Sequence, residues 1–203
     1  MFHTVKAKRR YHHGALRQAL IDEGFRALER DGLEALSLRA LAASTGVSKT
    51  APYRHFTNRQ ELLRTLAAEG FGALADTLEG VLAGPDNQPS ESPNAELRLL
   101  LTGYIDFAKT RPALYRLMFS RLGFSLHSEK CRVNSERTLA CLVRAVERAR
   151  TRGWRARQET NALVLSLWAQ AHGWAGLVIE DLLPSGLDNN PNAFWHMSEA
   201  LLE

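Results

Sequence analysis

The sequence has few cysteines, and it lacks the short motifs that identify many enzymes. Cys131 and Cys141 are its two cysteines, and ten residues on one helix correspond to about 15 Å of rise, too far for a disulfide. Neither cysteine has a histidine at metal-ligand spacing, and His12 and His13 are adjacent within a basic segment, so we expect no metal site. No glycine-rich phosphate loop and no Gly-x-Ser-x-Gly motif is present. We therefore expect no catalytic residue, no cofactor and no enzymatic activity.

Strand patterns and a secretory signal are absent as well. No stretch alternates apolar and polar residues, so we expect an all-α fold, and the basic amino terminus is followed by no apolar run, which predicts a cytoplasmic protein. The interval 161–179 has no charged residue and is long enough to span a membrane. We reject a membrane partner because this interval contains Asn161, Gln170 and His172 and lies among amphipathic helices. We expect the helix to be buried on all sides, either against a partner subunit or within the monomer core.

Acidic residues are scarce in the first third of the chain. Residues 1–60 hold 11 Lys and Arg against 5 Asp and Glu, a balance of +6, whereas residues 61–203 hold 15 against 17, a balance of −2. Positive charge is therefore concentrated at one end, as expected for a protein that binds a polyanion. Residues 1–12 end in a basic cluster without helical periodicity, and they are expected to form a disordered tail or a basic arm that contacts DNA.

One stretch in this basic third has the pattern of two short helices joined by a tight corner. Ser37 can cap the first helix, Gly46 can adopt the left-handed conformation of the corner, and Ser48 can cap the second helix. Ala42 lies four residues before the glycine, where a small side chain lets steeply crossing helices approach closely. The stretch is therefore predicted to be a helix-turn-helix whose second helix covers residues 48–55.

Helices are also expected on both sides of this motif. Apolar residues recur every three or four positions over residues 14–31, and Gly32 follows as a stop. Asn58 can cap the next helix, which is expected to run to about residue 82, and Glu61 suits its positive end. The fold class is therefore all-α, with a basic arm and a three-helix helix-turn-helix DNA-binding domain at 1–60.

The second helix of the motif should expose side chains that can bond a phosphate or a base edge of double-stranded DNA. Lys49 and Thr50 are the expected base readers, and Ala51 can contact a thymine methyl group. Tyr53 and His55 are expected to contact phosphates, although each could instead pack in the core. The complete set of expected DNA-binding residues is Ser37, Arg39, Ser48, Lys49, Thr50, Ala51, Tyr53, Arg54, His55 and Arg59.

Residues 61–203 are expected to form a helical effector-binding and dimerisation domain. Beyond a loop at 84–94, helices are expected over residues 95–110, 112–119, 132–152, 161–179 and 192–203, with a surface excursion at 123–130. Aromatic, methionine and histidine side chains on these helices could line an apolar pocket for a small-molecule effector, or they could simply fill the core. The candidate effector-binding residues are Tyr104, Phe107, Tyr115, Met118, Phe119, Trp168 and His172.

Several motifs together resemble those of a known family. Thr-Gly-Val-Ser-x-x-x-x-Tyr-Arg-His-Phe occupies residues 45–56, and a basic residue and Glu-Leu-Leu at 61–63 follow it. Residues 14–66 as a whole resemble the amino-terminal domain of the TetR family of bacterial transcriptional regulators. The segments Tyr-His-His-Gly at 11–14 and Ala-His-Gly-Trp at 171–174 resemble a subgroup with a His-Gly element in its regulatory domain.

The resemblance implies an all-helical regulator, a repressor whose second and third helices bind an operator. It also implies that the carboxy-terminal helices form a ligand pocket and a homodimer. A reading helix of about seven residues spans only about 10 Å, so two copies are expected to read a palindrome. The alternatives are an effector-independent helical DNA-binding or interaction protein, and a helical enzyme.

Two residues depart from the family pattern. Pro52 stands where most members have an apolar helix former, and it can restrict Ala51 and bend the reading helix. Arg59 replaces the usual lysine, and either residue can bind a phosphate. We therefore expect the proline to affect which operator sequence is bound, and we expect the arginine to have no such effect.

Overall fold

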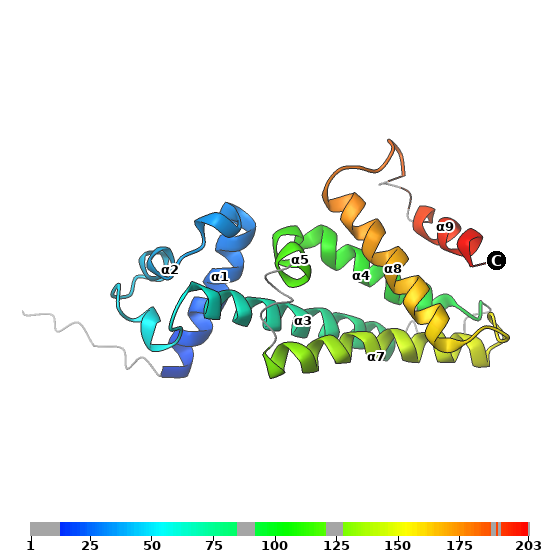
Figure 1. The fold of residues 1–203 in the computed structure, drawn as a ribbon, viewed down its shortest axis with the longest axis horizontal. Helices are drawn as coiled ribbons and strands as arrows, with labels where there is room; N and C mark the ends of the chain where they lie inside the picture. The colour runs from blue at the N-terminus through cyan, green and yellow to red at the C-terminus, as the bar shows by residue number, and fades with distance from the viewer. Residues whose placement is uncertain (1–12, 85–91, 121–127, 188–189, 191, 203) are drawn as a thin grey trace, which may run out of the picture. The chain divides into compact units, whose positions relative to one another are not determined.

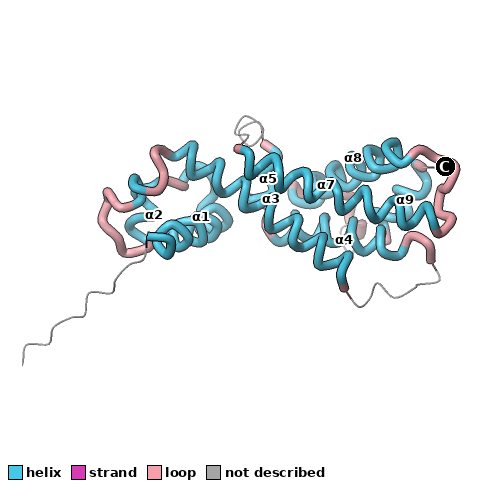
Figure 2. Tube along the Cα trace, turned by 90° about the horizontal axis from the view of Figure 1, so that it is seen from below, coloured by secondary structure: helices cyan, strands magenta, loops and turns pink. Residues whose placement is uncertain are grey.

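The structure is a computed structural model that describes residues 13–84, 92–120, 128–187, 190 and 192–202. Within these ranges every regular element is a helix, which confirms the expected fold class (Figure 1, Figure 2). The chain forms two compact units, residues 1–66 and 67–203. The expected basic arm at 1–12, residues 85–91 of the expected loop and residues 121–127 of the expected excursion lie outside the described residues.

Helix α1 (His13–Ala35) contributes the largest part of the first unit. Leu20 and Leu28 are completely buried, as their helical spacing predicts. The sequence predicts that the helix stops at Gly32. This glycine has φ 78° and ψ 175°, a conformation that L side chains rarely adopt, and it breaks the helix before a last helical segment at residues 33–35.

Helix α2 (Leu38–Ser44) and the corner after it agree with the predicted first half of the helix-turn-helix. Ser37 Oγ accepts a hydrogen bond from the Ala40 backbone N–H at 3.1 Å, which confirms the predicted N-cap. Gly46 has φ 69°, which confirms the left-handed corner. The buried residues of α2, which packs against α1, are Leu38, Leu41 and Ala42.

The second half of the motif differs from the prediction of a helix over residues 48–55. The structure has a turn at 49–51 followed by one 3-10 turn, η1 (Pro52–Arg54). Proline has no N–H to donate to the Ser48 carbonyl four residues earlier, and this carbonyl instead accepts from the Ala51 N–H, three residues on, at 2.9 Å. Ser48 Oγ pairs with Thr50 Oγ1 at 3.3 Å rather than with a backbone N–H, so the predicted Ser48 cap is wrong.

Helix α3 (Arg59–Ala83) begins in the first unit and continues in the second. Asn58 Oδ1 accepts a hydrogen bond from the Glu61 N–H at 2.9 Å, which confirms the predicted cap. The Glu61 carboxylate accepts bonds from the Thr57 hydroxyl at 2.7 Å and from its N–H at 2.6 Å, and these bonds lower the pKa of Glu61. The boundary between the units and the domain boundary expected at 60/61 both fall inside this helix.

The second unit combines the rest of α3 with α4 (Ala95–Thr110), α5 (Pro112–Phe119), α7 (Glu129–Thr151), α8 (Thr160–Ile179) and α9 (Ala193–Leu201). In Figure 1, α4 packs against α7 and α8, and α9 packs against α8. Helices α4 and α5 have the expected ranges. Helix α7 starts earlier than expected, within the predicted surface excursion, because Ser128 Oγ caps it by accepting a bond from the Cys131 N–H at 3.1 Å.

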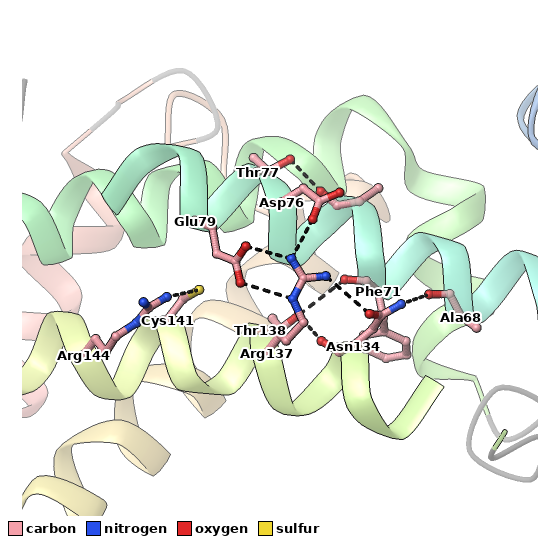
Figure 3. Close-up of polar contacts among 11 residues, drawn as sticks. Ala68, Phe71, Asp76, Thr77, Glu79, Asn134, Arg137, Thr138, Cys141 and Arg144 are labelled. Atoms are coloured by element: carbon pink, nitrogen blue, oxygen red, sulfur yellow. Dashed lines mark hydrogen bonds and ion pairs between the residues drawn. The ribbon is translucent and has the colours of Figure 1, made fainter. Parts of the chain in front are cut away.

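Polar side chains connect α3 to α7 (Figure 3). Asn134 is buried, and its Nδ2 donates to the Ala68 carbonyl at 2.8 Å. The Arg137 guanidinium donates to Asp76 at 2.7 Å and to Glu79 at 2.7 Å. Because a buried amide without a partner is costly, these bonds favour a single register between the two helices.

Helix α8 is the uncharged helix, and it is buried on one side only. Its buried residues are Leu163, Val164, Leu167, Ala171 and Ala175. The opposite side is exposed and includes Leu165 at 59% and Leu177 at 42%. The expectation of burial on all sides is therefore wrong for a single chain. The helix is long and apolar enough for a membrane span, and 33% of its most apolar window is buried in the protein. It is one such helix in the part of the chain that the structure describes, which is weak evidence for a membrane.

Candidate DNA-binding and effector sites

The turn at 49–51 and η1 carry most of the side chains expected to contact DNA. Lys49, Thr50 and Arg54 are exposed, and Tyr53 is 48% exposed, so this tyrosine is not a core residue. No acidic residue occurs between positions 36 and 60. The exposed surface therefore offers cationic groups and hydroxyl donors, the chemistry that binds phosphate oxygens and base edges.

Pro52 supports this exposed turn from the inside. Its side chain is buried, and the Phe56 N–H donates to its carbonyl at 3.0 Å. Ala51 keeps helical dihedral angles, φ −61° and ψ −43°, although residues before proline usually avoid this region. We call residues 49–54, the turn together with η1, the reading element. It is shorter and more tightly wound than the predicted α-helix, so its side chains have a different angular spacing around the helix axis.

Four other expected contact residues lie at or near the surface. Arg39 is exposed on α2, and Ser48 is exposed after the corner. Ser37 is partly exposed, and its capping bond uses the hydroxyl oxygen as acceptor, which leaves its proton free to donate. His55 is half-buried directly after η1. Each of these side chains stays a predicted DNA contact.

Arg59 has a structural role that the sequence did not predict. Its Nε donates to the Leu36 carbonyl at 2.8 Å, and its Nη2 donates to the Leu33 carbonyl at 2.5 Å. The Leu33 carbonyl lies in the last helical segment of α1 and also accepts from the Leu36 N–H at 3.3 Å, whereas the Leu36 carbonyl lies in the connection between α1 and α2. The guanidinium therefore ties this connection to the start of α3, and its contact with a phosphate stays a prediction.

The second unit contains a cavity of about 210 Å³ with an almost entirely apolar lining. Of the predicted effector-binding residues, Tyr104, Met118, Phe119 and Trp168 line it, whereas Phe107, Tyr115 and His172 do not. The lining residues that the prediction missed are Phe71, Leu78, Leu100, Leu101, Cys131, Ser135, Glu136, Thr138, Leu139, Leu142 and Ala171. Helical periodicity marked α3 and α7 as amphipathic, but it carries no information about which helices face one another across a cavity.

Tyr115 and His172 instead form a polar cluster with Tyr104 beside the cavity. The Tyr115 hydroxyl lies 2.6 Å from His172 Nδ1, and the Tyr104 hydroxyl lies 3.0 Å from the same nitrogen and 2.9 Å from the other hydroxyl. Burial lowers the pKa of His172 and raises the pKa of Tyr104 to about 12, so the cluster is uncharged at neutral pH. Phe107 is buried elsewhere, with the Arg111 guanidinium 5.2 Å from its ring centroid.

The cysteines are consistent with the sequence analysis. Both Cys131 and Cys141 are buried and free, and burial raises the pKa of the Cys131 thiol. Within the described ranges, no group of three His, Cys, Asp or Glu side chains is arranged to hold a metal ion. Thiol reactivity requires the thiolate, so the Cys131 thiol is poorly reactive.

A helix-turn-helix unit with an exposed cationic turn, followed by a helical unit with an apolar cavity, is the arrangement expected of a helix-turn-helix transcriptional regulator. Residues 20–66 match the family described as bacterial regulatory proteins of the tetR family, and residues 97–201 match the tetracyclin repressor-like C-terminal domain. The chain belongs to the TetR family, whose members are transcriptional regulators and not enzymes. The His-Gly subgroup stays a prediction.

Individual relatives agree with this assignment. An HTH-type transcriptional regulator of Mycobacterium tuberculosis is 30% identical over 112 residues, 55% of this chain and 47% of that protein. The HTH-type nicotine-responsive transcriptional repressor HdnoR of Paenarthrobacter nicotinovorans is 38% identical over 71 residues, 35% of this chain and 37% of that protein. The chain thus spans about half or less of these relatives. A solved structure of a protein with unknown function from Rhodococcus sp. RHA1 matches 95% of this chain and 96% of its own length, at TM-score 0.78 and 28% identity.

Proposed function

We propose that the protein is a repressor that binds a palindromic DNA operator as a homodimer and is released by a small-molecule effector. The observation that carries the proposal is the exposed turn with η1, where Lys49, Thr50, Tyr53 and Arg54 face solvent in a segment without acidic residues. The nicotine-responsive relative is described as a repressor, which supports this direction of regulation. The site of action would be the cytoplasm, where bacterial DNA is accessible.

The expected DNA-binding side chains can be assigned to base edges or to phosphates by their length and chemistry. We assign base-edge contacts to Lys49 and Thr50, and a contact with a thymine methyl group to Ala51. We assign phosphate contacts to Ser37, Ser48, Tyr53 and His55. Arg39 and Arg54 suit either role because a guanidinium binds a phosphate or a guanine edge with the same planar fork.

Dimerisation follows from the small size of this element. A segment of six residues reaches only a few base pairs, whereas two copies about 34 Å apart read a palindrome. Helix α8 offers a surface for a second copy, because Leu165, Ala169, Gly173 and Leu177 recur at every fourth position and are all exposed. A Cβ atom at residue 173 would meet nothing within 4 Å in the described protein, so packing within the chain does not require this glycine.

The cavity supports release by an effector. An effector-independent DNA-binding protein has no need for an apolar cavity in a unit that does not carry the helix-turn-helix. Phe71 and Leu78 of α3 line the cavity, and α3 also contributes its first turns to the DNA-binding unit. An effector that binds one arrangement of α3 more tightly than another would therefore shift the DNA-binding equilibrium.

Footprinting and gel-shift titration on the DNA that flanks the coding region test the proposal. We expect a protected palindrome with two protomers bound, and a log-log salt slope near −7 for about eight neutralised phosphates. A gel shift that is flat from low to moderate salt, or an unprotected flanking region, would contradict operator binding.

Two conservative variants test the assigned roles. Thr50→Ala removes a base reader, so we expect it to change the preference among operator variants, whereas Tyr53→Phe removes a phosphate bond and should weaken binding to all sequences alike. Thr102→Ala, an exposed threonine on α4, is the matched control and should change neither. Uniform loss of affinity in Thr50→Ala would show that Thr50 does not read bases.

A further inference from the structure

The residues with hydroxyl groups that line the cavity each donate the hydroxyl proton to another group of the protein. Among the described lining residues, these groups belong to Tyr104, Ser135 and Thr138. The Ser135 hydroxyl donates to the Arg132 carbonyl at 2.8 Å, and the Thr138 hydroxyl donates to the Asn134 carbonyl at 3.0 Å. Both protons are thus bonded to the backbone of α7, and only oxygen lone pairs are left for a ligand.

The hydroxyl proton of Tyr104 is donated within the cluster of Tyr104, Tyr115 and His172. The neutral His172 ring carries one N–H, and a proton on Nε2 lets Nδ1 accept from the Tyr115 hydroxyl at 2.6 Å. The Tyr115 oxygen then accepts from the Tyr104 hydroxyl at 2.9 Å. The Trp168 indole N–H acts on the Tyr104 hydroxyl as well, since it lowers the pKa of that group against the effect of burial. The opposite tautomer would leave one tyrosine proton without an acceptor in the cluster, which is unfavourable beside an apolar cavity.

The charges at the cavity disfavour an anionic ligand. No Lys or Arg is among its described lining residues, whereas Glu136 is. This carboxylate is largely exposed and lies 2.6 Å from the Arg132 guanidinium, so it is already paired. An anion would find no cationic partner among these described residues and would pay a high desolvation cost, and an ammonium group would find no unpaired carboxylate among them.

The size and the aromatic lining point to a small, flat occupant. A cavity of about 210 Å³ is below the roughly 300 to 1,000 Å³ of sites that bind drug-sized ligands. Phe71 and Phe119 line it with ring centroids 5.3 Å apart in an edge-to-face arrangement, and the Tyr104 and Trp168 rings line it as well. Aromatic rings favour offset-stacked and edge-to-face contacts with another aromatic ring.

We propose that the cavity binds a small, uncharged, largely aromatic molecule that carries a hydrogen-bond donor, such as a phenol, and excludes carboxylates of the same size. The donor is received by the Tyr104 oxygen, the most buried of the three lining hydroxyls. An ether, a carbonyl or a carboxylate has only acceptor oxygens, which would face the lone pairs of the lining hydroxyl oxygens and find no hydroxyl proton to accept. This proposal rests on the effector site inferred above and names the chemical class of that effector.

Calorimetric titration of the full chain with matched bicyclic probes tests the proposal. We expect 2-naphthol to bind about five- to tenfold more tightly than 2-methoxynaphthalene, because the ether lacks the donor, and we expect no binding of 2-naphthoate. An ether or a naphthoate that binds as tightly as the phenol would overturn the proposal. Tighter binding of 2-naphthylmethylammonium, or no binding of any probe, would overturn it as well.

Two tyrosine variants locate the acceptor. Tyr104→Phe removes the oxygen that receives the donor, so we expect the preference for the phenol over the ether to be lost. Tyr115→Phe is the matched control, because the Tyr104 hydroxyl can then donate to His172 Nδ1 at 3.0 Å and keep its oxygen free to accept. Loss of the preference in both variants would indicate collapse of the cluster and contradict recognition by Tyr104.

Gel shifts with the same preparations separate this inference from the proposed function. A phenol preference that leaves the DNA complex unchanged supports the chemistry of the cavity and contradicts release by an effector. A phenol preference in a protein that gives no gel shift contradicts operator binding alone. Retention of the gel shift with no preference among the probes overturns only the inferred ligand class.

Discussion

At the scale of single residues, Arg59 occupies a position where the family resemblance implies a phosphate contact, and it also has a structural role in this protein. The resemblance assigns a phosphate contact to this position, but the side chain donates to the carbonyls of Leu33 and Leu36. A planar guanidinium can satisfy two carbonyls at once, which a lysine cannot do in the same geometry. The replacement of the usual lysine therefore has a structural explanation in the connection between α1 and α2.

Arg59→Gln separates these two roles. Loss of the two bonds removes the Arg59 donor from the Leu36 carbonyl and leaves the Leu33 carbonyl with the Leu36 N–H alone, so we expect the free energy of unfolding to fall by about 1 to 2 kcal/mol in urea denaturation. Arg39→Gln removes the same charge from an exposed position, and we expect its stability to stay within about 0.5 kcal/mol of the wild type. Unchanged stability of Arg59→Gln, with a salt slope of DNA binding reduced by about one per protomer, would show that Arg59 acts on phosphate instead.

His172 links the polar cluster to pH. Burial holds the pKa of His172 below its ordinary value of about 6.5. The unfolded chain therefore binds a proton at higher pH than the folded chain does. The resulting stability is fully present above pH 6.5 and is lost as the pH falls through the lower folded pKa.

Urea denaturation between pH 8 and pH 5 measures this effect. We expect the wild type to lose more stability over that interval than His172→Gln, which has no ring to protonate. His196→Gln changes an exposed histidine on α9 and should follow the wild type. Identical pH dependence in wild type and His172→Gln would rule out a contribution from this residue.

At the scale of elements, two exposed glycines predict opposite effects of the same substitution. Gly46 has φ 69° in the helix-turn-helix corner, whereas Gly80 lies inside α3, and a Cβ at either position would meet nothing within 4 Å in the described structure. We expect Gly46→Ala to destabilise the protein by about 1 kcal/mol through backbone strain alone. We expect Gly80→Ala to stabilise it by about 0.5 to 1 kcal/mol through helix propensity. Thermal denaturation of both variants checks the signs, and a stabilising Gly46→Ala would contradict the need for a left-handed corner.

Local chemistry made many helix ends predictable. Ser37 and Asn58 form the expected caps because a cap involves atoms only three residues apart, and Gly46 forms the corner because few residues other than glycine adopt its conformation readily. Residues 48–55 were predicted incorrectly because Ser48 was interpreted as the cap of a regular helix, while Pro52 removes a backbone donor from its first turns. Here the missing N–H of the proline outweighs the capping signal of the serine.

The candidate effector site was only partly predictable, for reasons of distance along the chain. Tyr104, Tyr115 and His172 were selected as aromatic and polar residues on apolar helices, but only Tyr104 lines the cavity. The hydrogen bonds of the two tyrosines to His172 join positions 57 and 68 residues apart. Phe71 and the α7 lining residues were missed because periodicity identifies a buried face and not its partner helix. A prediction of which residues meet requires the tertiary packing.

At the scale of the whole molecule, the proposed function needs two chains. The reading element of one chain is short and contains one turn of 3-10 helix. High affinity for an operator would therefore require two reading elements held together in a dimer. The exposed row on α8, Leu165, Ala169, Gly173 and Leu177, is apolar and uninterrupted by charge. Small side chains in the middle of the row permit a close approach of two α8 helices, and the leucines at its ends supply apolar area.

Leu165→Glu tests whether this row forms the dimer. Leu165 is 59% exposed in the single chain, so a charge there should leave the fold intact, but it would be desolvated without a partner in a dimer interface. We expect sedimentation to show a monomer at micromolar concentration and operator affinity to fall about a hundredfold or more. Leu99→Glu makes the same change at a residue that is 47% exposed on α4, and it should remain dimeric and bind normally. A Leu165→Glu protein that stays dimeric would place the dimer interface elsewhere, whereas a monomer that keeps full operator affinity would show that one reading element suffices.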